Sequence, residues 1–114
     1  MSEIDPPGFH VERQGDVLIV RLTGPNVPPD LGEPLYRLVE EGVSNRFVLN
    51  LGAIRYLSSN GIGILATLRK RLDAVGGTLV ACQVDPEVHQ LLKYTNLDRL
   101  IPILDTEQDA LAVL

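Results

Sequence analysis

The sequence has little of what several common protein chemistries require. Cys82 is its only cysteine, so the chain forms no internal disulfide and no cysteine-rich metal site. It has no tryptophan, and its three tyrosines and two phenylalanines are scattered rather than gathered into a platform for stacked bases. Its two histidines are far apart in sequence and offer little to a transition metal. We therefore expect neither a metal nor another cofactor.

Positive charge and long apolar runs are also scarce. Ten basic residues stand against fifteen acidic ones, and the net charge of −5 disfavours nucleic acid and anionic membranes as partners. No apolar run approaches the roughly 18 residues that span a bilayer. Residues 1–8 are acidic and rich in proline, unlike a signal peptide. These absences predict a cytoplasmic protein that neither binds nucleic acid nor inserts into a membrane.

What remains is typical of one small α/β domain. The chain has 114 residues, of which 45% are hydrophobic and 22% charged, close to globular averages. The Asp-Pro-Pro-Gly run within residues 1–8 cannot continue a helix or a central strand, so we expect a flexible arm there. Residues 9–114 are then expected to form a single domain.

Hydrophobic periodicity predicts alternating strands and helices. The predicted strands are residues 9–13, 16–22, 46–51, 78–82 and 100–104. The predicted helices are residues 31–41, 61–75 and 86–94, with a last helix capped by Asp105 or Thr106. The first two strands should form a hairpin, and 46–51 and 78–82 should run parallel around the helix between them. Cys82 then ends a central strand as a buried, unreactive thiol.

Two details of these helices can be tested against the structure. Asp30 is the expected N-cap of helix 31–41, which Gly42 should end. The inward face of helix 61–75 is expected to consist of residues 62, 65, 68, 72 and 75.

Residues 56–63, Tyr-Leu-Ser-Ser-Asn-Gly-Ile-Gly, carry the most information. They join the carboxyl end of a parallel strand to a helix, where α/β sheets usually bind ligands and partners. Helix capping, worth about 1 kcal/mol, explains one of Ser58 and Ser59. It does not explain Asn60 beside them, nor Gly61 and Gly63, each of which costs a helix up to ~1 kcal/mol. A helix N-terminus also stabilises a phosphoserine dianion, so a phosphorylation switch is a second interpretation.

Enzymatic interpretations of the same segment are weaker. The glycines formally match a dinucleotide fingerprint with Asp85 downstream, but residues 52–60 separate the strand from the first glycine. Serine with His10 or His89 lacks the turn that a nucleophilic serine requires. We therefore expect no catalytic residue.

Five stretches of the chain share their pattern with a known family. They are residues 21–24, 47–51, 56–63, 76–80 and 97–101. Through these stretches and the order of its elements, residues 9–114 resemble the STAS domain family, in particular the bacterial anti-sigma-factor antagonists. The resemblance implies an α/β fold with a mixed four- to five-stranded sheet and about four helices packed mainly on one face.

The resemblance also implies a modification site. In that family the helix opens with Asp-Ser-Ser/Thr-Gly-Leu-Gly, and a partner kinase phosphorylates the serine that follows the Asp. Residues 61–63, Gly-Ile-Gly, match the end of this motif, which places Ser59 at the phosphoacceptor position and leaves Ser58 as the alternative. Ser58 stands where the family has its Asp, and Asn60 stands where it has the second hydroxyl residue.

A second acidic position of the family is also changed. The family commonly has Leu-Asp after the glycine that ends the early strand, whereas Pro25 and Asn26 follow Gly24 here. The loss of both carboxylates changes the surface that a kinase or a metal-dependent phosphatase would meet.

The function implied by the resemblance is that of a non-enzymatic switch in bacterial transcription regulation. The unphosphorylated protein would bind an anti-sigma factor that is also a serine kinase, and a serine phosphatase would reverse the modification. The kinase, not this chain, would bring ATP and Mg²⁺. A scaffold or transporter-associated subunit without phosphorylation, and a small anion- or nucleotide-binding domain, remain alternatives. The expected partner-binding residues are Ser58, Ser59, Asn60, Gly61, Ile62 and Asn26.

Overall fold

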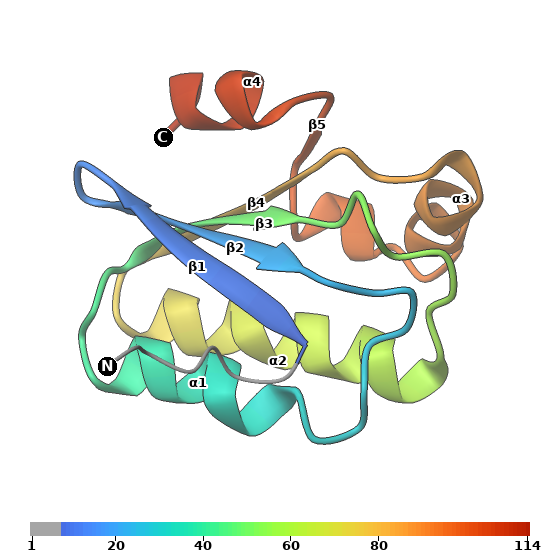
Figure 1. Ribbon diagram of the computed structural model, residues 1–114, viewed down its shortest axis with the longest axis horizontal. Helices are drawn as coiled ribbons and strands as arrows, with labels where there is room; N and C mark the ends of the chain where they lie inside the picture. The colour runs from blue at the N-terminus through green and yellow to red at the C-terminus, as the bar shows by residue number, and fades with distance from the viewer. Residues whose placement is uncertain (1–7) are drawn as a thin grey trace.

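The computed structural model describes residues 8–114, which form a five-stranded sheet covered by helices (Figure 1). The strands, in the spatial order β1-β2-β3-β4-β5, are β1 (Phe9–Gln14), β2 (Val17–Leu22), β3 (Arg46–Asn50), β4 (Thr78–Cys82) and β5 (Ile103–Leu104). β1 is antiparallel to β2, and the other neighbouring pairs are parallel. The predicted hairpin and the parallel strand pair around a helix are therefore confirmed. Except for Gly8, the expected arm at residues 1–8 lies outside the described residues.

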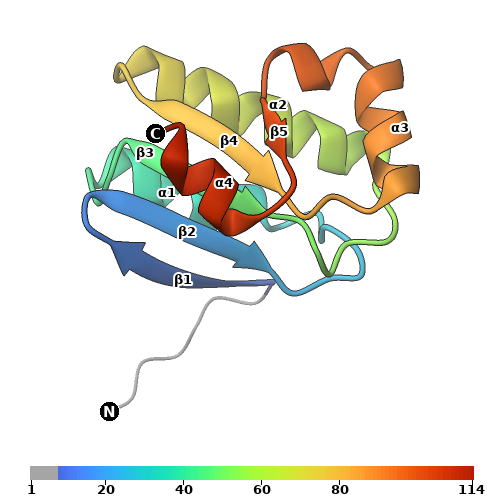
Figure 2. The same cartoon turned by 90° about the horizontal axis from the view of Figure 1, so that it is seen from above.

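Three helices cover one face of the sheet and a short one covers the other (Figure 2). The four helices are α1 (Gly32–Glu40), α2 (Ser59–Ala74), α3 (Pro86–Tyr94) and the short α4 (Glu107–Ala112). A 3₁₀ turn, η1 (Leu97–Arg99), follows α3. α4 lies alone on the face opposite α1 and α2 (Figure 1). The expected mixed sheet, with its helices mainly on one face, is confirmed.

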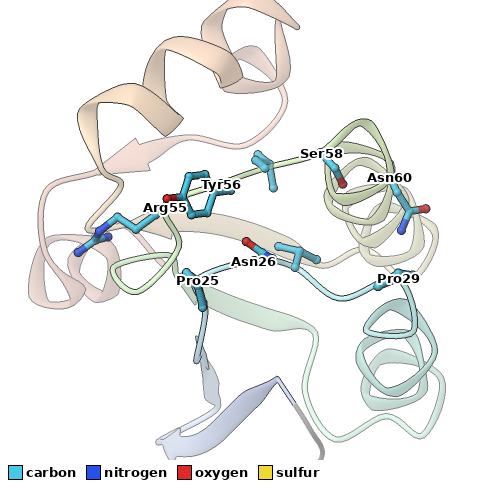
Figure 3. A pocket seen from close by; sticks show the side chains of 9 residues that line it. Pro25, Asn26, Pro29, Arg55, Tyr56, Ser58 and Asn60 are labelled. Atoms are coloured by element: carbon cyan, nitrogen blue, oxygen red, sulfur yellow. The ribbon is translucent and has the colours of Figure 1, made fainter.

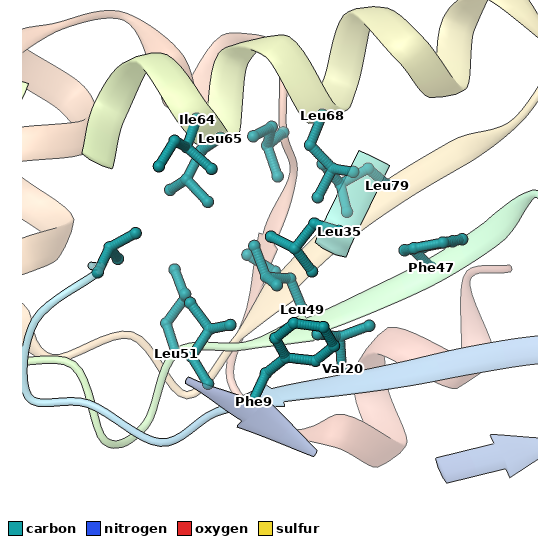
Figure 4. Packing of buried hydrophobic residues seen from close by; sticks show 14 of the residues in the cluster. Phe9, Val20, Leu35, Phe47, Leu49, Leu51, Ile64, Leu65, Leu68 and Leu79 are labelled. Atoms are coloured by element: carbon teal, nitrogen blue, oxygen red, sulfur yellow. The ribbon is translucent and has the colours of Figure 1, made fainter. Parts of the chain in front are cut away.

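The two faces of the sheet take alternate residues of each central strand. In β2, Leu18 and Val20 join the larger core under α1 and α2, whereas Val17 and Ile19 join the smaller cluster under α4. Figure 4 shows side chains of α1 and α2 packed over those of β2 and β3 in the larger core. Burial on both faces explains why these strands read as nearly continuous apolar runs in the sequence.

Two expectations about helix ends and faces are wrong. Asp30 does not cap α1: Leu31, which is 1% exposed, occupies the N-cap position, and no side chain bonds there. The burial of Leu31 thus fixes the start of α1 one residue later than expected. On α2 the inward face includes the buried Ile64, whereas Ile62 is half-buried and Val75 is 51% exposed. Val75 is not part of this face because α2 ends at Ala74. Ile64 replaces Ile62 because the helix is rotated so that Ile64 faces the sheet.

The expected last strand is shorter than residues 100–104. Only Ile103 and Leu104 pair with β4, because η1 and the turn after it occupy the chain up to Leu100. The Pro102 carbonyl accepts from Ala81 at 2.8 Å, but a proline has no N–H to extend the ladder.

A charged cluster fixes α4 to the sheet. The Arg21 guanidinium donates to both carboxylate oxygens of Glu107, at 2.8 and 2.9 Å, and to Glu12 at 2.7 Å. The buried Asn50 amide donates to Glu107 and to Gln83. The Arg21 hydrogen bonds, together with the one from Asn50, hold the pKa of Glu107 below its ordinary value, although partial burial opposes them.

Ser58 decides where α2 begins. Its backbone is extended, and its hydroxyl accepts from the Gly61 N–H at 3.0 Å, so that Ser59 becomes the first helical residue. The helix therefore starts two residues before the expected Gly61. Thr106 and Asp85 cap α4 and α3 in the same way.

We predict that Glu107→Gln destabilises the protein in a pH-dependent way. Because the folded-state pKa of Glu107 is lowered, its contribution of about 1 kcal/mol is present above 4.5, the ordinary value, and is lost as the pH falls through the lowered pKa. Urea unfolding at neutral pH should separate the variant from wild type, and the gap should close in acid. Glu12→Gln is the control: Glu12 also pairs with Arg21 but is more exposed, so its effect should be smaller.

We predict that Ser58→Ala and Ser59→Ala differ in stability. Ser58→Ala removes the α2 cap and should lower the free energy of unfolding by about 1 kcal/mol. Ser59→Ala should change it by no more than a few tenths of a kcal/mol, because Ala suits the first turn. Denaturant melts of the two variants provide the measurement, and equal losses would contradict the assignment of Ser58 as the cap.

Candidate functional site

The loops that follow β2 and β3 meet at one edge of the sheet. The two strands are parallel neighbours, so their carboxyl ends lie side by side. The Pro25 carbonyl in the first loop accepts from the Arg55 N–H at 2.8 Å and from the Tyr56 N–H at 3.2 Å in the second. These bonds join the segment that precedes α1 to the segment that precedes α2.

Gly24 allows the loops to approach this closely. Its φ of +63° is in the left-handed region, and a Cβ on it would lie 2.2 Å from the Ala53 carbonyl oxygen. Only a glycine satisfies both conditions. The contact fixes the position of the loop before α1 relative to the start of α2.

Between the loops lies an open groove of about 760 Å³ (Figure 3). Side chains from both loops and from the first turn of α2 line it. They are Pro25, Asn26, Val27, Pro29, Arg55, Tyr56, Leu57, Ser58 and Asn60. Arg55 stands at one end of the groove and Ser58 and Asn60 at the other, with Tyr56 and Asn26 between them (Figure 3).

Arg55 is the one formally charged residue in this lining. Its guanidinium donates to the carbonyl oxygens of Gly52, at 2.8 Å, and Ile54, at 3.1 Å. The Asp85 carboxylate lies 3.9 Å away and offsets part of the charge, while the Arg55 side chain stays 54% exposed. The groove is thus neutral to positive in a chain whose net charge is −5.

Ser58 and Ser59 have different environments in the structure. The Ser58 hydroxyl is held by its bond to the Gly61 N–H. Ser59 is exposed, and its hydroxyl has no hydrogen-bond partner among residues 8–114. Ser59 therefore presents a free hydroxyl to solvent at the positive end of the α2 dipole.

Gly61 and Gly63 have different roles. A Cβ on Gly61 would lie 2.9 Å from a Leu57 methyl and 3.3 Å from the Val27 Cβ, so this glycine lets the loops pack against α2. A Cβ on Gly63 would meet nothing within 4 Å in the described part of the chain beyond its neighbours and its own helix backbone, and the residue is exposed. Nothing in the fold requires a glycine at position 63.

The structure brings together only part of the expected partner-binding set. Ser58, Asn60 and Asn26 line the groove, and Ser59 is exposed beside it. Gly61 is buried behind the groove and Ile62 packs against the core.

The sequence analysis included Tyr56 in the segment 56–63 but placed neither Tyr56 nor Arg55 in the partner-binding set, although Tyr56 is 68% exposed. Their place in a loop after a parallel strand, beside the loop of the neighbouring strand, is the signal that could have identified them.

Other candidate chemistry is weak in the part of the chain that the structure describes. Residues 8–114 contain no group of three His, Cys, Asp or Glu side chains that could hold a metal ion. Cys82 is fully buried, as expected, and burial raises the pKa of its thiol to about 11, so it carries almost no thiolate near neutral pH. None of the helices in this range has the length and hydropathy of a membrane span.

Known proteins share this sequence pattern and this fold. The STAS domain profile matches residues 9–110. The anti-sigma F factor antagonist of Paenibacillus polymyxa is 32% identical over 110 residues, which cover 93% of each chain. The crystal structure of an anti-sigma factor antagonist from Mycobacterium paratuberculosis is similar, with a TM-score of 0.81, 25% identity and coverage of 96% of this chain and 97% of that one.

A more distant structure has the same fold. The Bacillus protein SpoIIAA, in its phosphorylated form, has a TM-score of 0.70 at 18% identity, covering 91% of this chain and 96% of that one. The matched profile and the near-complete coverage of a relative above 30% identity lead to one conclusion. The chain belongs to the STAS domain family and is similar over almost its whole length to anti-sigma-factor antagonists.

Proposed function

We propose that this chain is a non-enzymatic, cytoplasmic switch that binds an anti-sigma factor when unphosphorylated and releases it when Ser59 is phosphorylated. The anti-sigma factor would itself be the serine kinase, and a separate phosphatase would restore the binding state. Transcription by the sigma factor would then follow the phosphorylation state of Ser59. The relative from P. polymyxa, named an anti-sigma F factor antagonist, supports this class of partner.

The observation that carries the proposal is the contrast between the two serines. Ser58 uses its hydroxyl to cap α2, and Ser59 exposes a hydroxyl that has no structural duty in residues 8–114. A kinase can therefore modify Ser59 without breaking a bond of the fold. The adjoining groove offers a surface on which a partner would cover that hydroxyl.

The physical effect of a phosphate at Ser59 is local. It adds up to two negative charges, which the N-terminus of α2 stabilises by about 0.3–1 kcal/mol for a surface site. The fold is therefore expected to tolerate the modification. A partner packed on the same surface would have to desolvate the dianion, and the complex would be lost.

The exposed Gly63 supports a close contact on this face of α2. Glycine within a helix costs about 1 kcal/mol relative to alanine, and within residues 8–114 a Cβ at position 63 would meet no atom within 4 Å beyond its chain neighbours and its own helix backbone. A partner surface that approaches the α2 backbone gives a physical reason for a residue without a side chain at this position.

We predict that Ser59→Asp weakens binding to the anti-sigma factor at least tenfold, whereas Ser59→Ala keeps it. Aspartate adds charge at the contact, while alanine removes only a hydroxyl group. Calorimetric titration of the purified serine-kinase anti-sigma factors of the same genome, with ADP and Mg²⁺, provides the measurement. Thr106→Ala is the matched control, since it removes the cap of α4, outside the groove, and should lower stability but keep binding.

The modification itself can be observed directly. Incubation of the chain with the same anti-sigma factor, ATP and Mg²⁺ should add one phosphate to the tryptic peptide 56–69, and fragmentation should place it on Ser59. Phosphate on Ser58 would instead identify the N-cap residue of α2 as the site of the switch. Binding without modification, and with no effect of Ser59→Asp, would instead favour a constitutive scaffold.

We predict opposite effects of Gly63→Ala on stability and on binding. The free energy of unfolding should rise by up to about 1 kcal/mol, because alanine is the better helix former and its methyl group has free space. Binding to the anti-sigma factor should weaken, because that methyl group would enter the contact. Unchanged affinity in the stabilised variant would exclude Gly63 from the interface.

A further inference from the structure

We propose that the groove receives a segment of the anti-sigma factor in which an apolar side chain adjoins an acidic one, with Tyr56 packing on the first and Arg55 pairing with the second. This inference rests on the proposed function and deepens it, since it assigns the chemistry of the partner segment. Neither residue belongs to the partner-binding set that was expected from the sequence.

The groove has a fixed shape before any partner binds. One wall is the loop of Pro25 and the other is the loop of Tyr56, and the Pro25 carbonyl accepts two N–H groups of the opposite wall. Contacts of Val27 and Leu57 with the Gly61 position join both walls to α2. A segment that enters such a site loses its own freedom but need not order the site, which lowers the free-energy cost of binding.

The middle of the groove suits an apolar side chain. Pro25, Val27, Pro29 and Leu57 contribute apolar surface from both walls. Tyr56 stands between the ends of the groove and is 68% exposed, so most of its ring surface is available to a partner (Figure 3). Exposed tyrosines beside such pockets are among the residues that contribute most to binding at interfaces.

The Arg55 guanidinium at one end of the groove favours a partner segment in which an acidic residue adjoins the apolar one. The lining holds no carboxylate, although acidic residues outnumber basic ones by fifteen to ten in the whole chain. Arg55 is oriented by its bonds to the Gly52 and Ile54 carbonyls, and its side chain remains 54% exposed beside Asp85. A partner carboxylate there gains a pair with an arginine already in position, whereas a lysine or arginine would be repelled.

The position of the positive charge, at the end of the groove away from Ser58 and Asn60, agrees with a switch at Ser59. Ser58 and Asn60 form the end of the groove opposite Arg55, and Ser59 lies between them in sequence (Figure 3). Arg55 is thus poorly placed to neutralise a phosphate on Ser59. An acidic partner segment in the groove would be repelled by that phosphate, which adds to its desolvation cost.

Charge reversal tests the acidic half of the inference. Arg55→Glu should weaken binding to the purified anti-sigma factor at least tenfold, and Arg55→Met should weaken it less. Arg13→Glu makes the same change in net charge on β1, outside the groove, and should alter affinity less than twofold. Circular dichroism of each variant verifies the fold, and the neutral Arg55→Met variant provides the test if the reversed charge disturbs the loop.

Aromatic truncation tests the apolar half. Tyr56→Ala should weaken binding about tenfold or more, whereas Tyr94→Ala, at a tyrosine that is 88% exposed outside the groove, should change it less than twofold. If Arg55→Glu binds as tightly as Arg13→Glu, or more tightly, while Ser59→Asp still abolishes binding, the groove inference is wrong and the switch stands. If Ser59→Asp has no effect, or no anti-sigma factor binds wild type, the proposed function fails and the groove inference with it.

Discussion

The parallel pairing of β2 with β3 is the constraint on which the candidate site depends. It aligns the carboxyl ends of both strands at one edge of the sheet, so that each following loop begins beside the other. The Pro25 carbonyl then joins the loops by accepting the N–H groups of Arg55 and Tyr56. The groove follows from that join, and the locally capped start of α2 places Ser58 and Asn60 at one end of it. A register shift between β2 and β3 would separate these features while leaving each local sequence unchanged.

Most of the fold could be predicted because its signals are local. The hairpin, the glycines that end α1 and α2, and the caps at Asp85 and Thr106 each depend on a few adjacent residues. The predictions were wrong where tertiary contacts determine the start or the inward face of a helix. The burial of Leu31, and not the capping preference of Asp30, sets the start of α1. The face of α2 depends on its docking angle, which no spacing rule contains.

The same distinction between local signals and tertiary contacts applies to the candidate site. Position in a motif was enough to single out Ser58, Ser59 and Asn60, because a helix start is a local event. The family motif placed Ser59 at the phosphoacceptor position, but the sequence left open which serine caps the helix, and the bond from the Gly61 N–H identifies Ser58. No partner-binding role was assigned to Arg55 or Tyr56, because the groove that they line also needs Pro25 and Asn26 from the opposite loop. Such a juxtaposition of distant segments exists only in the folded chain.

Electrostatics explains how one small surface could serve two states. The chain is acidic overall, so long-range forces do not attract an acidic segment, and the specificity proposed above would have to come from Arg55 and the groove at short range. In the proposed switch, the N-terminus of α2 would stabilise a phosphate on Ser59 without help from a basic side chain, so the fold is expected to tolerate the modification. The proposed partner would have no such compensation, because its carboxylate would face the new dianion across a groove whose one cationic lining residue, Arg55, stands at the far end. Under the proposed function, a charge that the domain tolerates would be strongly unfavourable at its interface, which is the asymmetry that a reversible switch requires.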